Sequence, residues 1–444
     1  MRDFLPVQVR KREYVIGVIK SVYEKYGFEP LETPAVENLS TLTDKYGDEG
    51  DQLMYKILKR GEKLTKRLES GEIKSENALC DLALRYDLTV PLARVIANYR
   101  NELPKFFKRY QIQPVWRADR PARGRYREFY QCDVDAIGSS SMVVEAELCA
   151  AVCEILEMLG FEDYSVKVND RELLFEILEA AEIQSDLTGQ AVVILDKLDK
   201  IGPEKVKSEL QEAGVSESAA GRLLGLFSDS VGKSNTQKLD LITGFVKGSE
   251  KAHAALAGMR ELVGFANTSR LEIDASLARG LSYYTGAIFE VVLTDGDFSG
   301  SIAGGGRYDG LIGMFGKEQI PAVGLSIGLE RILLIMDERG LFPDEIPNAA
   351  ADVMVTLWSA ELTAESMRLA AELRSDGLRV LVYPQPDKPG KQFKYADQLE
   401  IPFVCILGET EQESGMVKLK NLNSGTQETV DRSAVPAKIR SYAS

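Results

Sequence analysis

Apolar residues recur every three or four positions near the amino terminus, which is the spacing of a helix with one buried face. Over 7–26 this pattern predicts an amphipathic helix that ends at Gly27. The segment FEPLETPAVE follows, and Pro34 within it predicts an edge or interface strand, because proline cannot donate to a ladder. The same spacing predicts a second helix over 143–159, ended by Gly160. The amino-terminal region therefore combines helices with strand segments.

Between these helices the pattern changes to the alternation that is typical of strands. Residues 82–94 begin as an alternating strand and turn near Pro91, and 114–138 predict an antiparallel hairpin with a long basic tip. Side chains on its returning strand alternate between Gln131, Asp133 and Asp135 on one face and Cys132, Val134 and Ala136 on the other. A polar row with an apolar back predicts a face that holds water or a ligand.

The character of the chain changes twice more. Residues 171–267 have a helical pattern rich in Glu, Lys, Ala and Leu, which predicts a helical insertion, and strand patterns return at 271–277 and 286–293. A polar, proline-bearing linker is predicted at 337–351. After it, from 352 onward, strand and helix patterns alternate, which predicts a small α/β domain with a largely parallel sheet.

Composition excludes several kinds of protein. The net charge of −14 argues against broad, unspecific nucleic-acid binding, yet residues 105–127 carry eight Lys and Arg against one Asp. Such a local basic loop suits a phosphate ligand in a cleft, although a solvated basic hairpin is the alternative. His253 is the single histidine, so histidine-based triads and most zinc sites are nearly excluded. No apolar run is long enough for a membrane span, and the five scattered cysteines suit a reducing cytosol.

Four arginines lie beside glycine, proline or acidic residues in segments predicted as strand or turn: Arg117, Arg125, Arg279 and Arg331. A guanidinium is permanently charged and its planar fork matches phosphate and carboxylate. The triplet Gly304, Gly305 and Gly306 allows a backbone to approach a ligand closely. The chain lacks a GxxxxGK[ST] loop, and GGGRYDG does not have dinucleotide-fingerprint spacing.

Five motifs along the chain resemble those of a known family. The region around Pro34, then VWRADR with EFYQCDVD, then GLSIGLER resemble the three signatures of class II aminoacyl-tRNA synthetases. ARGLSYYTGAIFE and AGGGRYDGL resemble the two signatures peculiar to histidyl-tRNA synthetases. RYDLTVP and YREFYQCDVD are most similar to the eukaryotic-type branch, since many bacterial members place Glu where this chain has Asp87 and Asp135.

The resemblance covers nearly the whole chain and implies an α+β fold, in which helices flank an antiparallel class II sheet, with a C-terminal α/β anticodon-binding domain. The expected divisions are a catalytic core in two parts (1–170 and 268–336), the helical insertion (171–267), the linker (337–351) and the anticodon-binding domain (352–444).

For the substrate histidine the resemblance implies six residues: Asp87, Thr89, Gln131, Asp135, Tyr283 and Tyr284. The first three would hold the α-ammonium, which needs acceptor oxygens. Asp135 and Tyr284 would clamp the two imidazole nitrogens, with Tyr283 lining the pocket beside them. A site built from such hydrogen bonds needs no editing domain.

For ATP the resemblance implies Arg117, Asp119, Arg125 and Arg331, with Arg279 beside Arg117 at the α-phosphate. Arg117 and Arg279 would be catalytic, because charge builds there as the histidine carboxylate attacks. Arg331 would hold the γ-phosphate, with Mg²⁺ sharing its charge. The backbone would approach the ligand at Gly304, Gly305, Gly306 and Gly328. Metal ligands, and the roles of Ser282 and Glu290, stay open.

The implied activity is ATP-dependent attachment of L-histidine to tRNA(His) through a histidyl-adenylate, by a cytoplasmic homodimer. The main alternative is a histidine-binding regulatory paralogue of ATP phosphoribosyltransferase, which charges no tRNA and lacks the C-terminal domain. A class II synthetase of another specificity would share that domain but not ARGLSYYTG. For each residue taken alone, a structural role is a respectable alternative.

Overall fold

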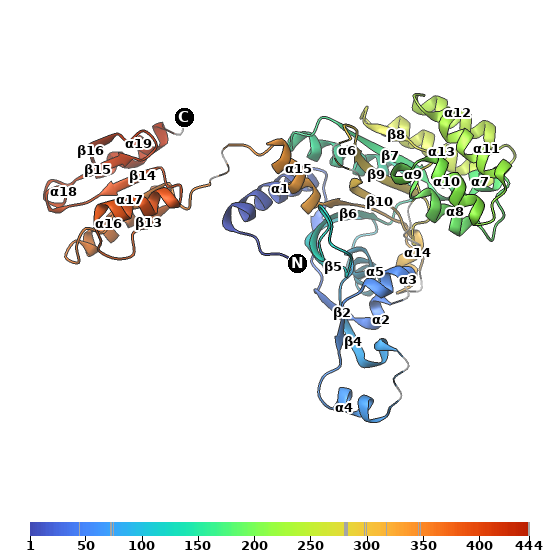
Figure 1. Ribbon diagram of the computed structural model, residues 1–444, viewed down its shortest axis with the longest axis horizontal. Coiled ribbons are helices and arrows are strands. Elements are labelled where there is room, and N and C mark those ends of the chain that lie inside the picture. The colour runs from blue at the N-terminus through green and yellow to red at the C-terminus, as the bar shows by residue number, and fades with distance from the viewer. Residues whose placement is uncertain are drawn as a thin grey trace. The chain divides into compact units, whose positions relative to one another are not determined.

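The computed structural model describes residues 1–43, 45–71, 73, 75–278, 283–296, 298, 300–316, 318–344, 346 and 348–442. The chain divides into two compact units, Met1–Phe342 and Pro343–Ser444. Each unit has its own sheet and its own apolar core (Figure 1). None of the helices in the described part of the chain combines the length and apolar character that a membrane crossing demands.

A large sheet organises the first unit. Within the described residues it has eight strands in the order β1-β5-β6-β11-β10-β9-β7-β8. Their bounds are β1 Glu29–Pro30, β5 Phe107–Trp116, β6 Glu128–Ile137, β7 Tyr164–Asp170, β8 Leu271–Ile273, β9 Ala287–Leu293, β10 Ser301–Arg307 and β11 Ala322–Gly328. Only the two edge pairs, β1–β5 and β7–β8, are parallel among these strands. The predicted antiparallel sheet and the hairpin formed by β5 and β6 are therefore confirmed.

Helices cover one face of this sheet. They are α1 Pro6–Lys25, α6 Met142–Met158 and α15 Leu329–Arg339 (Figure 1); α1 contacts both other helices, and α6 and α15 contact β6. Cys132, Val134 and Ala136 point into this core with Ile19 and Tyr23. The opposite face of β6 therefore carries Gln131, Asp133 and Asp135, as the alternation predicts.

A smaller sheet, in the order β2-β4-β3, is formed by strands that lie between β1 and β5 along the chain. Its strands are β2 Val36–Asn38, β3 Lys56–Leu58 and β4 Cys80–Leu84; the helical segments around them are α2 Leu39–Leu42, α3 Gly47–Leu53, α4 Glu62–Glu69, η1 Glu76–Leu79 and α5 Thr89–Asn98. Figure 1 shows α4 at the end of an arm that leaves the body of the unit near β4.

Two expectations about prolines need correction here. Pro34 lies between β1 and β2 rather than within a strand. Pro91 does not form a turn after a strand: it lies in the first turn of α5, where a backbone N–H has no helical partner.

Residues 171–267 are helical, as predicted. The helices are α7 Arg171–Ala180, α8 Thr188–Leu195, α9 Leu198–Ile201, α10 Pro203–Glu212, α11 Glu217–Ser230, α12 Asn235–Phe245 and α13 Glu250–Phe265. They share one apolar core with the large sheet, and α13 packs against α6. This segment therefore belongs to the first compact unit.

The second unit is the predicted α/β domain. Its described strands lie in the order β13-β12-β14-β15-β16, with bounds β12 Val353–Val355, β13 Val380–Val382, β14 Phe403–Ile406, β15 Met416–Asn421 and β16 Gln427–Asp431. The helical segments are α16 Thr363–Ser375, α17 Pro389–Gln398, α18 Glu409–Ser414, η2 Arg432–Ala434 and α19 Val435–Ser441. The first three strands along the chain pair in parallel, as predicted, whereas β15 and β16 add an antiparallel edge that the sequence reading did not include.

Candidate active site

The polar face of β6 forms the floor of a cavity of about 310 Å³. Thirteen of the predicted site residues line this one cavity: Asp87, Thr89, Arg117, Asp119, Arg125, Gln131, Asp135, Tyr283, Tyr284, Gly304, Gly305, Gly328 and Arg331. Gly306 lies on β10 just outside the lining, and Arg279 lies outside the described residues. Segments far apart in sequence therefore meet around a single space.

At one end of the cavity, a buried ion pair holds Asp135. Nη2 of Arg109 on β5 lies 2.8 Å from Oδ2 of Asp135, and the hydroxyl of Tyr308 donates to Oδ1. Burial raises the pKa of Asp135, while Arg109 and Tyr308 act to lower it. The register pairs Arg109 with Asp135 across β5 and β6, so the strand pairing itself sets this contact.

Two paired glycines make room for the predicted imidazole contacts. A Cβ on Gly324 would lie 1.9 Å from Oδ1 of Asp135, and one on Gly306 would lie 2.7 Å from the ring of Tyr284. Gly306 and Gly324 are partners in the β10–β11 register. Asp135 therefore packs over Gly324, and Tyr284 packs over its strand partner Gly306. Any residue larger than glycine at these two positions would fill the space that these side chains occupy.

Aromatic rings close the same end. The ring centroid of Tyr283 lies 4.9 Å from that of Tyr284 and 6.3 Å from that of Tyr308. Asp87 is held beside them, because its Oδ1 accepts hydrogen bonds from the hydroxyl of Tyr46 at 2.8 Å and the backbone N–H of Val90 at 3.0 Å. Buried tyrosines of this kind give a rigid wall with polar tips.

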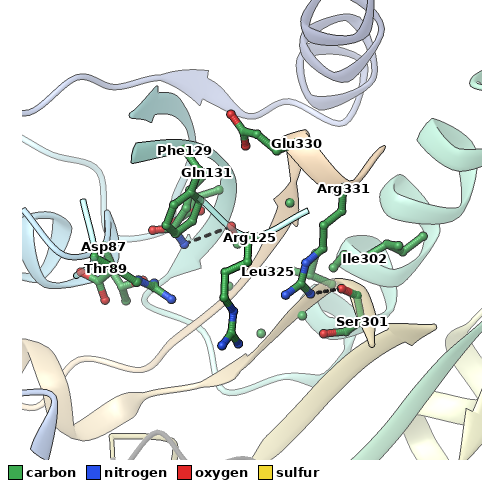
Figure 2. A pocket seen from close by; sticks show the side chains of 18 of the residues that line it. Asp87, Thr89, Arg125, Phe129, Gln131, Ser301, Ile302, Leu325, Glu330 and Arg331 are labelled. Atoms are coloured by element: carbon green, nitrogen blue, oxygen red, sulfur yellow. Dashed lines mark hydrogen bonds between the residues drawn. The ribbon is translucent and has the colours of Figure 1, made fainter. Parts of the chain in front are cut away.

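Three arginines also line the cavity: Arg117 lies near Asp87 and Tyr283, whereas Arg331 lies away from Asp87 in Figure 2. Arg117 donates from Nε to the carbonyl of Tyr86 at 3.1 Å, and its guanidinium lies 4.3 Å from the centroid of the Tyr86 ring. Arg331, in the first turn of α15, donates to the carbonyl of Ser301. Figure 2 shows Arg125, which is exposed, between the Asp87 side and Arg331 in this view. Three permanent positive charges therefore face one cavity.

Glu330 sets the position of the strand that carries the polar row. Both of its carboxylate oxygens lie 3.1 Å from the backbone N–H of Tyr130 and accept its hydrogen bond, and Arg12 lies 3.7 Å away. Burial raises the pKa of Glu330. Although Glu330 lines the cavity, these contacts indicate a structural role at the start of β6.

The sequence reading missed four polar residues of the site: Arg109, Asp133, Tyr308 and Ser326. All but Arg109 line the cavity, and Arg109 is fully buried behind it. The period of two placed Asp133 on the correct face, which was the available signal, but no role was drawn from it. Glu290, whose role stayed open, pairs with Gly304 in the strand register and is not among the lining residues.

The described residues contain no group of three or more His, Cys, Asp or Glu that could hold a metal ion. Mg²⁺ commonly keeps its waters and binds through substrate phosphates rather than an all-protein cage. The arginines that line the cavity suit phosphates, on which such an ion would be carried.

Comparison with known proteins identifies the family. Residues 1–332 match the family model for histidyl-tRNA synthetase, and residues 352–442 match an anticodon binding domain. The chain belongs to the histidyl-tRNA synthetase family. It is similar to the histidine–tRNA ligases of Cytophaga hutchinsonii (44% identity, covering 96% of this chain and 95% of the relative) and Christiangramia forsetii (41%, covering 97% and 96%).

A solved structure agrees with this assignment. The histidyl-tRNA synthetase of Nostoc sp. aligns over 99% of this chain and 97% of its own, with 31% identity and a TM-score of 0.81. A Bacillus halodurans protein described as an ATP phosphoribosyltransferase regulatory subunit/histidyl-tRNA synthetase aligns at a TM-score of 0.72 with 20% identity, which shows a shared fold alone. Because the similar relatives are bacterial, the expected placement in a eukaryotic-type branch is not supported.

Proposed function

We propose that this protein is a histidine–tRNA ligase that joins L-histidine to tRNA(His) with ATP. The observation that carries the proposal is the single cavity, in which an acidic, tyrosine-lined end adjoins three arginines. The acidic, tyrosine-lined end suits an ammonium group and an imidazole, and the arginines suit a triphosphate.

The reaction has two steps that these side chains can support. The carboxylate of histidine attacks the α-phosphorus of ATP, the bond to the β-phosphate oxygen breaks, and diphosphate leaves with the electron pair. The ribose hydroxyl at the tRNA terminus then attacks the acyl carbon of the adenylate, and AMP leaves. The first step needs no protein base, since the substrate carboxylate is already ionised near pH 7.

Arg117 is the catalytic group of the described chain in this proposal. Its contacts with Tyr86 fix the guanidinium before ATP binds, so little reorganisation accompanies the build-up of charge on the α-phosphate. Arg279 is proposed to act beside it. Arg331 takes the γ-phosphate, Arg125 the phosphate chain, and Asp119 the adenine side, with Mg²⁺ carried on the phosphates.

At the other end, Asp135 and Tyr284 read the imidazole, and Asp87, Thr89 and Gln131 receive the α-ammonium. Asp135 already accepts from Tyr308 and pairs with Arg109, so its orientation is fixed before the substrate arrives. Pre-set hydrogen-bond partners of this kind can reject analogues that lack the polar groups by about 10⁴–10⁵.

The competing role is histidine sensing without catalysis. A sensor needs the histidine end alone, whereas this cavity also carries Arg117, Arg125 and Arg331. The chain also has a second compact unit in the region that matches the anticodon binding domain. Both features favour the ligase.

Exchange of labelled diphosphate into ATP tests the proposal. Exchange should depend on L-histidine, and the full chain should charge tRNA(His). Exchange stimulated by another amino acid, or none with any, would reject the assignment.

Removing residues 352–444 separates the two activities. The first unit holds the whole cavity, so exchange should persist while charging of tRNA falls by at least about 10²-fold, the loss of roughly 3 kcal/mol of binding. Normal charging by the shortened protein would refute the role of the second unit. A cytoplasmic homodimer is also proposed, and sedimentation that shows only monomers at micromolar concentration would refute the dimer.

A further inference from the structure

Asp133 lies between the two predicted histidine contacts of β6. It is 3% exposed, and its side chain shares a face with Gln131 and Asp135. Its register partners are Gln111 on β5 and Ser326 on β11. Asp133 lines the cavity, yet Oδ1 has no hydrogen-bond partner among the described residues.

One hydroxyl orients both Asp133 and its neighbour Gln131. Nε2 of Gln131 donates to Oγ of Ser326 at 3.2 Å, and a hydrogen bond from Ser326 to Asp133 lowers the pKa of that carboxyl. This arrangement leaves Oε1 of Gln131 buried and, like Oδ1 of Asp133, without a partner in the described part of the chain. Each buried orphan acceptor costs about 1–3 kcal/mol, so the pair is expected to receive donors from a ligand.

The charges at this end do not balance. Arg109 forms its ion pair with Asp135 at 2.8 Å, and no second cation is paired with Asp133 among the described residues. Burial raises the pKa of Asp133 to about 7, opposed by Arg109 and reinforced by the charge of Asp135. Oε1 of Gln131 and Oδ1 of Asp133 both need a hydrogen-bond donor, and Asp133 also lacks a paired cation. A ligand group that donates hydrogen bonds and carries a positive charge would satisfy both needs.

An ammonium group meets these requirements, since it carries three donors, no acceptor and one positive charge. Gln111 does not compete for this role, because its Oε1 already accepts from Nη1 of Arg109 at 3.3 Å and it is not among the residues that line the cavity. Asp87 can accept fewer further hydrogen bonds from a ligand, since its Oδ1 already accepts two.

We propose that Asp133 is a substrate-binding residue, which receives the α-ammonium of histidine on Oδ1 while Gln131 receives it on Oε1. Ser326 is the positioning residue that holds both acceptors toward the ligand. The inference deepens the proposed function and rests on it, because it names a further contact of the same substrate.

Asp133→Asn tests the assignment, because it keeps the shape and removes the charge. In diphosphate exchange, the KM for histidine should rise about 10–100-fold, as expected for loss of a charge-assisted hydrogen bond, while the KM for ATP stays within about 2-fold. Asp229→Asn, on the exposed surface of α11, is the matched control and should behave as the unmodified chain.

Two inhibitors locate the contact on the substrate. Histidinol keeps the ammonium and imidazole, whereas 3-(imidazol-4-yl)propanoate keeps the imidazole and carboxylate but has no ammonium. Asp133→Asn should weaken histidinol about 10–100-fold and leave the propanoate within about 3-fold. Equal weakening of both, a joint rise in the KM for ATP, or no change would each overturn the inference.

Ser326→Ala supplies a second variant should Asn at position 133 prevent folding. It keeps both acceptors but removes their common orienting hydroxyl, so histidinol should weaken by about 3–10-fold, and the propanoate should not. Equal weakening of histidinol and the propanoate by Ser326→Ala would contradict the proposal. If the unmodified protein shows no histidine-dependent exchange, the proposed function fails rather than this inference.

Discussion

At the end of the cavity proposed for histidine the polar groups lie on central strands, whereas the arginines proposed for phosphate come from a loop and the first turn of a helix. Asp133 and Asp135 are 3% and 2% exposed, while Arg125 is exposed. The difference fits what the proposed function asks of each end. Telling imidazole from other side chains requires acceptors held by a packed sheet, whereas binding phosphate requires permanent charge more than close fit.

The two ends also differ in the cost of a change. A glycine under Asp135 or Tyr284 cannot accept a Cβ without moving backbone or buried groups. An arginine in the loop can be shortened without opening the core. Substitutions at the phosphate end should therefore change catalysis, and those at the histidine end should change both binding and stability.

The largest expected effect belongs to the phosphate end. Arg117→Ala should lower the rate of adenylate formation by about 10²–10³-fold, because a fixed positive charge at the developing negative charge is lost. Histidinol affinity should stay within about 3-fold, since histidinol has no carboxylate for this arginine to bind. Stopped-flow measurement of adenylate formation gives the rate.

Arg123→Ala is the matched control for that prediction. Arg123 lies in the same loop but pairs with Glu338 and is not among the residues that line the active cavity. Its loss should change the rate by less than about 2-fold, within the range of surface ion pairs. An equal fall for both variants would show that the loop is merely disrupted.

The next effect tests the paired glycines of the histidine end. Gly324→Ala would place a Cβ 1.9 Å from Oδ1 of Asp135, so the KM for histidine should rise at least about 10-fold and stability should fall by roughly 1–3 kcal/mol. Urea unfolding measures the second quantity.

Gly221→Ala in α11 provides the contrast. No atom lies within 4 Å of the Cβ it would add, so this variant should gain about 0.5–1 kcal/mol. A neutral result at Gly324 would show that Asp135 moves aside freely, which contradicts the rigid end described above.

The pH dependence of stability provides a third test. The pKa of Asp133 is raised to about 7 in the folded chain, well above the value of about 3.9 for an unfolded aspartate. Its contribution to stability is therefore fully present below about pH 4 and is lost as pH rises through 7. Between pH 5.5 and 8.5 the unmodified protein should lose on the order of 2 kcal/mol relative to Asp133→Asn.

Urea unfolding of both proteins at the two pH values measures this difference. Saturating histidinol should shrink it, because an ammonium beside the carboxylate favours the ionised form. Parallel pH profiles for the two proteins without ligand would contradict an uncompensated carboxyl at position 133.

The smallest effect is expected at Arg125. Arg125→Lys keeps the charge but removes the planar fork, so the KM for ATP should rise only about 3–10-fold. Stability should change by less than about 0.5 kcal/mol, since the side chain is exposed. A large loss of stability would place Arg125 in the fold rather than in the phosphate end.

Much of the fold follows from local patterns. The helix over α1, the β5–β6 hairpin and the alternation of β6 were predictable, because a period of 3.6 or 2 assigns side chains to faces without knowledge of the partner. Pro34 and Pro91 were misplaced, because the same proline chemistry allows a strand edge, a loop or the first turn of a helix. The antiparallel edge of β15 and β16 was not predicted.

The site divides in the same way. The motifs pointed to Asp87, Gln131, Asp135 and the tyrosine pair, which line one cavity, because these residues stand in recognisable local sequences. Arg109 and Ser326 stand in no such sequence, and they become important only through cross-strand register.

The sequence by itself determined which residues could bind phosphate, which face of β6 is polar and to which family the chain is related. Only the tertiary structure decided which charged side chains of the site are paired with a partner. Register across β5, β6 and β11 gives Arg109 to Asp135 and Ser326 to Asp133, and it leaves Oδ1 of Asp133 without a hydrogen-bond donor among the described residues. Pairing of charges depends on distances across strands, and periodicity along one strand carries no information about them.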